Sequence, residues 1–153
     1  MVSKAVWGPA VWYLFHTLAQ KVDESQFMLI RNELIQFVYR ICANLPCPEC
    51  ASHAEAFLKK NSNRPIRNKE DFKRLLLDLH NHANANTKKP MFTYEQLNEK
   101  YDRANTQMVV QNFFNIYGAK TYNIKLLTNR FHKDILLSDF SAWILRNSTK
   151  FQV

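Results

Sequence analysis

The stretch of sequence that decides the fold class spans residues 69–86 and reads KEDFKRLLLDLHNHANAN. Its apolar positions recur every three or four residues, at Phe72, Leu75, Leu76, Leu79 and Ala83. This spacing places them on one face of an α-helix, so the pattern predicts an amphipathic helix over residues 69–86. His80 lies within the same apolar stripe and, as a polar residue facing a core, needs a partner.

Comparable periodicity on both sides of this stretch predicts further helices. The expected ranges are residues 9–21, 25–43, 48–60, 93–103, 105–117 and 132–147. Ser25 is the expected N-cap of the second helix, and Gly118 is the expected break between the last two. With only two glycines and five prolines in 153 residues, the chain has few turn signals for a multi-stranded β fold. The expected fold is therefore all-α, built around one main core.

The net charge of +8 suits a nucleic acid, a membrane surface or a phosphorylated cofactor. The basic residues are spread through the chain, however, so a solvated surface explains most of them and nucleic acid is not an expected partner. No stretch approaches the roughly 20 apolar residues of a membrane span, and residues 1–20 lack the pattern of a secretory signal. The chain is therefore expected to be soluble.

The three cysteines, at positions 42, 47 and 50, are too few and too clustered for a secreted disulfide framework. Cys47 and Cys50 form a CxxC motif at the expected start of a helix, because Pro48 suits a first turn. Unpaired N–H groups and the positive end of the helix dipole favour a thiolate there. Cys47 is the expected attackable sulfur and Cys50 its protected partner, whereas Cys42 is expected to be a buried, inert hydrophobe.

A CxxC motif also occurs in thioredoxin-like enzymes and in zinc sites. The thioredoxin-like motif follows a strand, whereas the residues before this motif have helical periodicity. A zinc site of Cys47, Cys50, His80 and His82 has suitable ligand types. Because His80 and His82 lie two apart on one helix and point in different directions, zinc is a minor alternative and no metal is expected.

Polar residues accompany His80 along the helix over residues 69–86. His80, Asn84 and Lys88 recur every four residues, which predicts one polar column. A single such histidine is explained most simply by a hydrogen bond to a nearby carbonyl. Together with Asn81 and Lys89, the column favours a bound polar ligand that carries phosphate groups.

Three blocks of residues follow one another along the chain. They are Trp12-x-x-x-His16, Pro46-Cys47-x-x-Cys50-x-x-His53, and His80-Asn81-x-x-Asn84 followed by Lys89-Pro90-x-Phe92. In order and spacing, over about residues 7–101, they resemble the Erv/ALR family of FAD-linked sulfhydryl oxidases. The resemblance implies a four-helix bundle with a short fifth helix that holds FAD, usually as a homodimer. Residues 1–103 are therefore expected to form the FAD-binding domain, and residues 104–153 a helical extension packed on it.

The resemblance also implies roles for individual residues. Cys47 and Cys50 would be the catalytic pair, with Cys50 beside the flavin ring. Trp12 and His16 would pack against the flavin and adenine portions of the cofactor, which Gly8 would border. The remaining residues expected to contact adenine, ribose or pyrophosphate are His53, His80, Asn81, Asn84, Lys88, Lys89 and Tyr101, the last at a position where the family often has tryptophan.

The chain departs from the family in two respects. Gly8 is followed by Pro9, where cellular members commonly have arginine, so Lys4 or Lys88 is expected to supply charge for the phosphates. A second structural disulfide and a separate shuttle pair of cysteines have no counterpart in the sequence. Substrate thiols are therefore expected to reach Cys47 directly, unless Cys42 assists.

The implied activity is the oxidation of protein thiols to disulfides, with electrons passing through FAD to O2 and giving hydrogen peroxide. The alternatives are a flavin-free helical module that binds zinc or a partner, and a reductase or isomerase that exchanges thiols without consuming oxygen. Short family members that lack the shuttle pair and carry such extensions are often encoded by large DNA viruses, where they make disulfides in the host cytoplasm, so virion proteins are among the substrates that the resemblance implies. The expected location is thus the host cytoplasm or the virion, and otherwise the mitochondrial intermembrane space.

Overall fold

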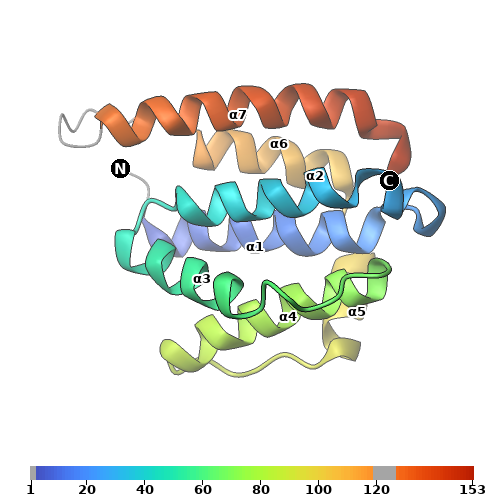
Figure 1. The fold of residues 1–153 in the computed structure, drawn as a ribbon, viewed down its shortest axis with the longest axis horizontal. Coiled ribbons are helices and arrows are strands. Elements are labelled where there is room, and N and C mark those ends of the chain that lie inside the picture. The colour runs from blue at the N-terminus through green and yellow to red at the C-terminus, as the bar shows by residue number, and fades with distance from the viewer. Residues whose placement is uncertain (1–2, 119–126) are drawn as a thin grey trace.

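A computed structural model of the chain describes residues 3–118 and 127–153. Within these ranges the chain forms seven α-helices and no β-strand, so the predicted all-α fold is confirmed (Figure 1). The helices are α1 (Lys4–Lys21), α2 (Glu24–Ala43), α3 (Pro48–Lys60), α4 (Lys69–Asn86), α5 (Tyr94–Asp102), α6 (Thr106–Tyr117) and α7 (Leu127–Asn147), followed by a 3-10 turn, η2 (Ser148–Lys150).

The bounds of α3 and α4 are those predicted, the starts of α2, α5 and α6 differ by one residue, and α1 and α7 begin about five residues earlier than predicted. Helix α1 begins at Lys4 rather than at residue 9, so Pro9 lies inside it. Pro9 lies in the second turn of α1, where it has no N–H to donate to the carbonyl of residue 5, and the helix nevertheless continues through it. Helix α7 begins at Leu127 rather than at residue 132.

The predicted N-cap of α2 was wrong, because Asp23 occupies that position and Ser25 lies within the first turn. The carbonyl of Asp23 accepts hydrogen bonds from the backbone N–H groups of Gln26 and Phe27, at 2.9 and 3.0 Å. The N–H of Asp23 itself donates to the carbonyl of Lys150 at 2.8 Å. A contact with the far end of the chain therefore fixes this helix start, which local sequence does not reveal.

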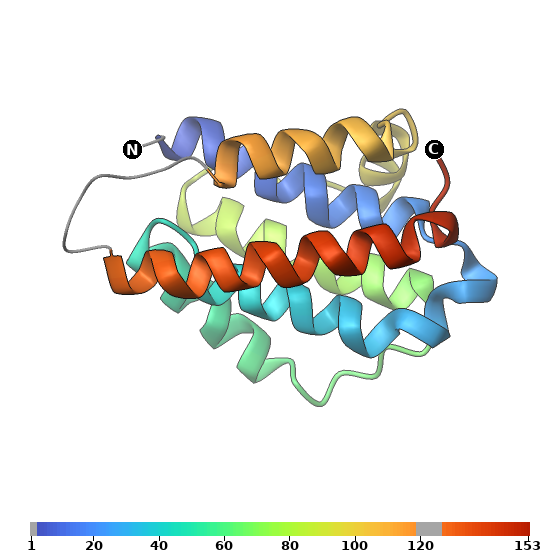
Figure 2. The ribbon, with the colours of Figure 1, turned by 90° about the horizontal axis from the view of Figure 1, so that it is seen from above.

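Helix α1 lies at the centre of the bundle, in contact with α4, α5 and α6, while α2 contacts α3 and α7. In Figure 1, α6 and α7 lie along the upper side of the molecule, and α3 and α4 along the lower side. Figure 2 shows, from above, that α1, α2, α6 and α7 run roughly along one common direction, with the start of α1 and the C-terminus toward opposite ends of the molecule.

The core extends without interruption from the first two helices into α6 and α7. Phe37 of α2 packs against Phe140 and Trp143 of α7, with ring centroids 5.1 and 5.4 Å apart. Phe113 of α6 stacks on Tyr117 at 4.9 Å and meets Phe140 edge to face at 5.9 Å. The last two helices therefore pack on the bundle and share its core.

The C-terminal residues close one end of the bundle. Val22 and Phe151 form an isolated antiparallel bridge, and the N–H of Gln152 donates to the carbonyl of Lys21 at 2.7 Å. The hydroxyl of Thr106 donates to the carbonyl of Gln152 at 2.6 Å. These bonds hold together the turns that precede α2 and α6.

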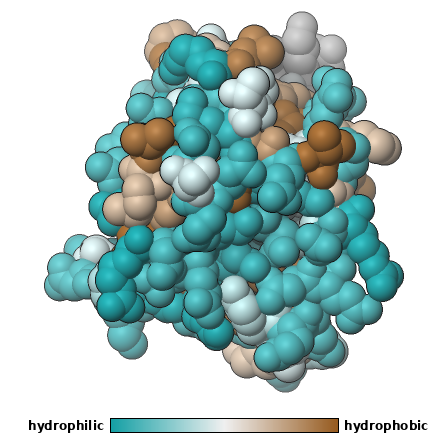
Figure 3. Space-filling view, turned by 90° about the vertical axis from the view of Figure 1, so that its right-hand side faces the viewer, coloured by the Kyte–Doolittle hydropathy of each residue, from teal (hydrophilic) through white to brown (hydrophobic). Residues whose placement is uncertain are grey.

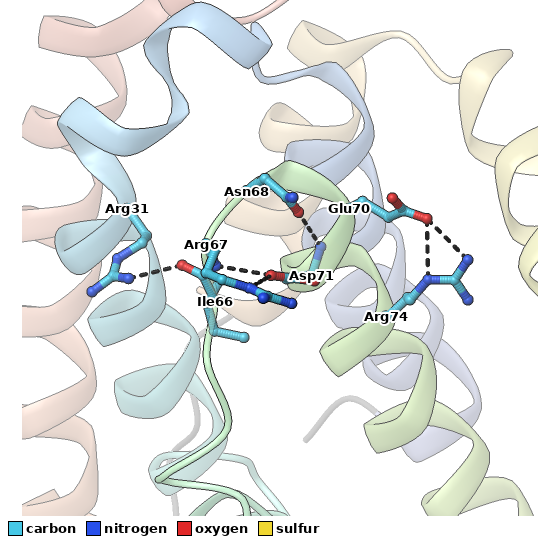
Figure 4. Close-up of polar contacts among 7 residues, drawn as sticks. All are labelled: Arg31, Ile66, Arg67, Asn68, Glu70, Asp71 and Arg74. Carbon is cyan, nitrogen blue, oxygen red and sulfur yellow. Dashed lines mark hydrogen bonds and ion pairs between the residues drawn. The ribbon is translucent and has the colours of Figure 1, made fainter.

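The start of α4 is fixed by side-chain caps (Figure 4). The side chain of Asn68 accepts a hydrogen bond from the N–H of Asp71 at 2.8 Å, as an N-cap residue does. The Asp71 carboxylate in turn accepts from the N–H of Arg67 at 3.0 Å. Arg31 of α2 donates to the carbonyl of Ile66 at 2.8 Å and so ties the preceding loop to the bundle.

In residues 3–118 and 127–153, every helix is too short or too polar to cross a bilayer. The face in Figure 3 is mostly hydrophilic, and its hydrophobic residues form separate small patches.

Candidate functional site

A cavity of about 110 Å³ lies beside the CxxC motif, and α1, α3 and α4 supply most of its wall. Four residues predicted to meet a cofactor line it: Gly8, Trp12, Cys50 and His53. Most of the wall is apolar. A Cβ at Gly8 would meet only Lys4 Cγ, at 4.0 Å, so the chain itself does not fill the space beside this glycine.

The CxxC motif opens α3, as predicted. Cys47 is the N-cap residue of α3, and its Sγ accepts a hydrogen bond from the N–H of Cys50 at 3.2 Å. Both thiols are unbonded and partly exposed. The helix start therefore presents its free N–H groups and positive dipole end to the Cys47 sulfur, an arrangement that stabilises negative charge.

The two cysteines of the cavity wall, Cys50 and Cys42, have raised pKa values. For Cys50, burial has the largest effect, followed by the hydrogen bond and charge of Cys47, while the positive charge of Lys4 lowers the pKa. Burial, and then the charge of Glu55, raises the pKa of Cys42 to about 12. Cys42 is 2% exposed, which confirms that it is buried, although its contact with the cavity was not predicted.

A stack of aromatic rings lies beside the cavity and joins three helices. Trp12 of α1 and His80 of α4 lie face to face, with centroids 4.0 Å apart and planes inclined by 6°. His16 Nε2 lies 2.9 Å from His80 Nδ1, and the ring of Tyr101 lies 4.7 Å from that of His16. The structure thus brings together four of the residues predicted to bind the cofactor, at positions far apart in sequence.

Both histidines of this stack are held neutral at neutral pH. Burial, and then the charges of Lys100 and Lys89, lowers the pKa of His80 to about 4. Burial, followed by the effects of His80 and Lys100, lowers the pKa of His16 well below its usual value. Two neutral imidazoles can share a hydrogen bond because one ring donates an N–H and the other accepts it.

Two buried polar atoms next to this stack have no hydrogen-bond partner in the described part of the chain. They are His16 Nδ1 and Asn84 Nδ2, on side chains only 1% and 6% exposed. A buried polar atom without a partner costs roughly 1–3 kcal/mol. Such atoms are uncommon in folded proteins. Three more in the described residues are Thr17 Oγ1, Gln20 Oε1 and Asn98 Oδ1. His16 and Asn84 differ from these three in that the sequence predicted both as cofactor contacts.

Asn81 holds the segment that follows α4. Its side-chain N–H donates to the carbonyl of Phe92 at 2.9 Å, and its side-chain oxygen accepts from the N–H of Phe92 at 2.8 Å. This pair of bonds fixes Phe92 beside His80, with ring centroids 5.2 Å apart. In the structure, Asn81 therefore positions the wall of the site through the backbone.

The predicted polar column ends earlier than expected. Helix α4 ends at Asn86, and Lys88 has a φ of 57°, so it lies outside the helix and off the His80–Asn84 face. The N–H of Lys89 donates to the carbonyl of Asn84 at 2.8 Å, as the chain turns back over the helix end. Both lysine side chains are exposed, and the Lys89 charge acts on His80.

The zinc alternative does not match the arrangement of its ligands. His80 is directed toward His16, whereas the ring of His82 lies 5.2 Å from that of Phe57. The two histidines therefore point in different directions, as predicted. Throughout the described ranges, no three His, Cys, Asp or Glu side chains lie close enough to share a metal ion.

Several residues of the cavity wall were not predicted to lie beside Cys50. Among them are Trp7 of α1, Lys4, which was expected only as a source of charge for the phosphates, and His82 of α4, which was weighed only as a zinc ligand. The residues of α1 on this wall lie at positions 4, 7, 8, 11, 12 and 15, which follow the three-and-four spacing of one helix face. That spacing is visible in the sequence, but placing the helix start at residue 9 concealed it.

Comparisons with known proteins place this site in a family. The sequence profile of the Erv1/Alr family matches residues 9–102, which run from α1 to the end of α5. The FAD-linked sulfhydryl oxidase of African swine fever virus (isolate Warthog/Namibia/Wart80/1980) is 28% identical over 98 residues, which are 64% of this chain and 82% of the viral protein. No solved structure gives a significant match.

Cellular relatives are similar over the same region. The FAD-linked sulfhydryl oxidase ERV1 of Oryza sativa subsp. japonica is 28% identical over 104 residues, which are 67% of this chain and 52% of the plant protein. The mitochondrial FAD-linked sulfhydryl oxidase ERV1 of Saccharomyces cerevisiae is 26% identical over 85 residues, which are 56% of this chain and 44% of the yeast protein. The matched region thus covers about half of these two cellular proteins.

Proposed function

The chain belongs to the Erv1/Alr family, and on this premise we propose that it is an FAD-linked sulfhydryl oxidase with Cys47 and Cys50 as its redox-active pair. One observation carries the proposal: Cys50 of the CxxC motif lines a largely apolar cavity together with Trp12 and His53. A cysteine pair at such a cavity can exchange electrons with a flat, apolar ring system.

The residues around the cavity fit FAD. Its apolar wall suits a flavin ring, and the unpartnered His16 Nδ1 and Asn84 Nδ2 offer polar contacts to the adenosine part. The exposed Lys88 and Lys89, at the end of α4, supply positive charge for the diphosphate. When bound there, FAD supplies a two-electron acceptor that passes the electrons on to O2, with hydrogen peroxide as product.

The chemistry of the protein's own residues is thiol–disulfide exchange. A substrate thiolate attacks Cys47 Sγ of the oxidised pair, so a new S–S bond forms and the Cys47–Cys50 bond breaks. The electron pair of the broken bond leaves on Cys50. A second substrate thiolate then attacks the substrate sulfur, releases the substrate disulfide and leaves Cys47 as a thiolate, and the two electrons now reside in the cysteine pair.

The assignment of the two sulfurs follows from their positions. Cys47 lies at the start of α3, where the N–H of Cys50 already contacts its sulfur. Cys50 lines the cavity, and burial raises the pKa of its thiol. Cys47 is therefore the sulfur that meets substrate, and Cys50 the sulfur that meets the cofactor.

The substrates in this proposal are thiol-containing proteins, virion proteins among them if the chain is viral. The relatives include a viral and a mitochondrial enzyme, so the host cytoplasm or virion and the mitochondrial intermembrane space are both compatible with the family. We further propose a homodimer, as the resemblance to the family implies. Sedimentation of the purified protein tests that assembly.

The proposed function is tested by oxygen uptake. Purified protein should carry bound flavin and consume oxygen when dithiothreitol is added, with formation of hydrogen peroxide. Cys47→Ala and Cys50→Ala should each abolish the uptake while leaving the flavin bound. Protein that stays colourless and consumes no oxygen after addition of FAD would contradict the proposal.

A further inference from the structure

Lys4 lies in the cavity wall, outside the region that matches the family. It is the first residue of α1 and lies outside residues 9–102, which match the family. Lys4 lines the same cavity as Cys50. Its position close to Cys50 is also evident in its effect on the thiol, since its charge acts on that group.

The charges facing Cys50 come from several elements. Cys47, Glu49 and His53 belong to the same segment as Cys50, while Cys42 of α2 and His82 of α4 line the cavity with it. Cys42 stays protonated, because burial raises its pKa to about 12. None of these side chains carries a permanent positive charge.

Lys4 is the single lysine or arginine among the residues that line the cavity, and no aspartate or glutamate lines it. Lys4 also forms no ion pair within residues 3–118 and 127–153. An unneutralised ammonium group at the edge of an apolar cavity favours an anion nearby. The group in this wall that becomes an anion during thiol exchange is Cys50.

We propose that Lys4 is a positioning residue that stabilises the Cys50 thiolate when the Cys47–Cys50 disulfide opens. This inference rests on the proposed function, in which Cys50 is the leaving sulfur. As the substrate sulfur bonds to Cys47, the S–S electron pair leaves on Cys50 and the negative charge passes from the substrate to that sulfur. The ammonium group of Lys4 then faces the new thiolate across the cavity wall.

The physical reason is that a negative charge on the Cys50 sulfur is unfavourable at this position. Burial and the neighbouring Cys47 both raise the pKa of Cys50 and so oppose its thiolate, while Lys4 acts in the other direction. A thiol with a lower pKa leaves a disulfide faster. Lys4 therefore offsets part of the penalty that burial places on the leaving sulfur.

The test is the pH dependence of Cys50 alkylation. Purified protein is reduced and kept anaerobic, iodoacetamide is added over a range of pH, and modification of Cys50 is followed by mass spectrometry. Because the thiolate is the reacting form, Lys4→Met should slow alkylation of Cys50 about three- to tenfold on the rising part of the profile. Lys4→Arg should restore the rate, since it keeps the charge.

A matched control removes a lysine elsewhere. Lys60→Met also removes one positive charge, but at the C-terminal end of α3 and away from the cavity. The pH dependence of Cys50 alkylation should be unchanged in this variant. Circular dichroism of each variant shows whether it is folded. An unchanged Cys50 profile in folded Lys4→Met would overturn the proposal, and so would a loss of bound flavin in that variant with no change in alkylation.

Failure of the proposed function gives a different result. Alkylation of the reduced protein requires neither flavin nor oxygen, so it reports on the effect of Lys4 on Cys50 alone. Oxygen uptake of the unmutated protein reports on the oxidase activity. A Lys4→Met effect on alkylation in a protein without oxygen uptake would overturn the leaving-group role, because no oxidase cycle would then use it.

Discussion

The two sides of α1 differ in how completely their polar groups are paired. On the side of α6 and α7, the Tyr117 hydroxyl donates to the carbonyl of Asn44 at 2.7 Å, and Trp143 Nε1 donates to the Glu33 carboxylate. On the cavity side, His16 Nδ1 and Asn84 Nδ2 have no partner within the described residues. The difference teaches that the polar groups named on the α6 and α7 side already have protein partners, whereas these two remain available to the cofactor proposed above.

Substitution of one tryptophan on each side of α1 should show the largest difference between the two sides. Trp143 is 1% exposed in the aromatic core, whereas Trp12 borders the cavity. Trp143→Ala should lower the free energy of unfolding by about 3–5 kcal/mol, because it leaves a large void in a packed core. Trp12→Ala should cost less stability but release bound flavin. Urea unfolding and the flavin content after gel filtration measure the two effects.

Similar effects of the two substitutions on stability and on flavin content would contradict this difference between the two sides. Trp143→Ala that loses flavin at full stability would place cofactor contacts on the side of α7. Trp12→Ala that unfolds as readily as Trp143→Ala would show that its ring is needed mainly for packing.

The histidines of the cavity side should make stability depend on pH. His80 has a pKa of about 4 in the folded chain and takes up a proton near pH 6.5 when unfolded. Between these values the unfolded chain binds more protons, so stability falls as the pH falls from about 6.5 to 4, by up to roughly 3 kcal/mol. His16 acts in the same direction.

Urea unfolding at pH 7 and at pH 4.5 checks this expectation. His80→Gln retains a polar side chain but does not titrate, so its unfolding midpoint should change less between the two pH values than that of the unmutated protein. Equal changes in both proteins would mean that other groups cause the pH dependence.

Two buried asparagines give a third, smaller contrast. The side chain of Asn147 donates to the carbonyl of Trp143 at 2.9 Å, whereas Asn84 Nδ2 has no partner among the described residues. Asn147→Leu should cost about 1–2 kcal/mol of stability, since a hydrogen bond is lost and a buried carbonyl is left with one partner fewer. Asn84→Leu should leave the stability of the flavin-free protein equal or higher, and weaken flavin binding.

Thermal unfolding of both variants, with and without added FAD, makes this contrast measurable. Added FAD should stabilise Asn147→Leu as it does the unmutated protein. If Asn84→Leu destabilised the flavin-free protein as much as Asn147→Leu, the Asn84 side chain would have a structural partner.

The smallest effect is expected at Cys42. This thiol borders the cavity but is buried, and its pKa of about 12 keeps it protonated. Cys42→Ala should therefore retain oxygen uptake within a few-fold of the unmutated protein. Loss of uptake comparable to that of Cys50→Ala would give Cys42 a part in electron transfer.

Elements defined by local patterns could be predicted from the sequence. The apolar periodicity of α4 and the proline at the first position of α3 predicted the bounds that both helices have in the structure. The α2 start could not be predicted, because the bond from Asp23 to Lys150 spans almost the whole chain. Lys88 was misplaced for a different reason, since the helical column was extended past the residue at which α4 ends.

The site residues that belong to the three sequence motifs could be predicted. The contacts between helices that bring these residues together could not. Cys50, Trp12 and His53 were predicted and meet at the cavity. The rings of Trp12 and His80 stack although the two residues are 68 positions apart in the sequence. The periodicity within each helix does not predict which residues of different helices meet. Lys4 was considered only as a source of charge for phosphate, and its proximity to Cys50 follows from the fold alone.

The most direct test of the central claim is the visible spectrum of the purified protein during anaerobic addition of dithiothreitol. The account predicts a yellow protein whose flavin band is bleached by dithiol, completely after about two equivalents per site because the disulfide and the flavin each take two electrons, and returns on admission of air, while Cys50→Ala stays yellow throughout. A colourless protein, or a flavin band that dithiol bleaches equally well in Cys50→Ala, would contradict the account.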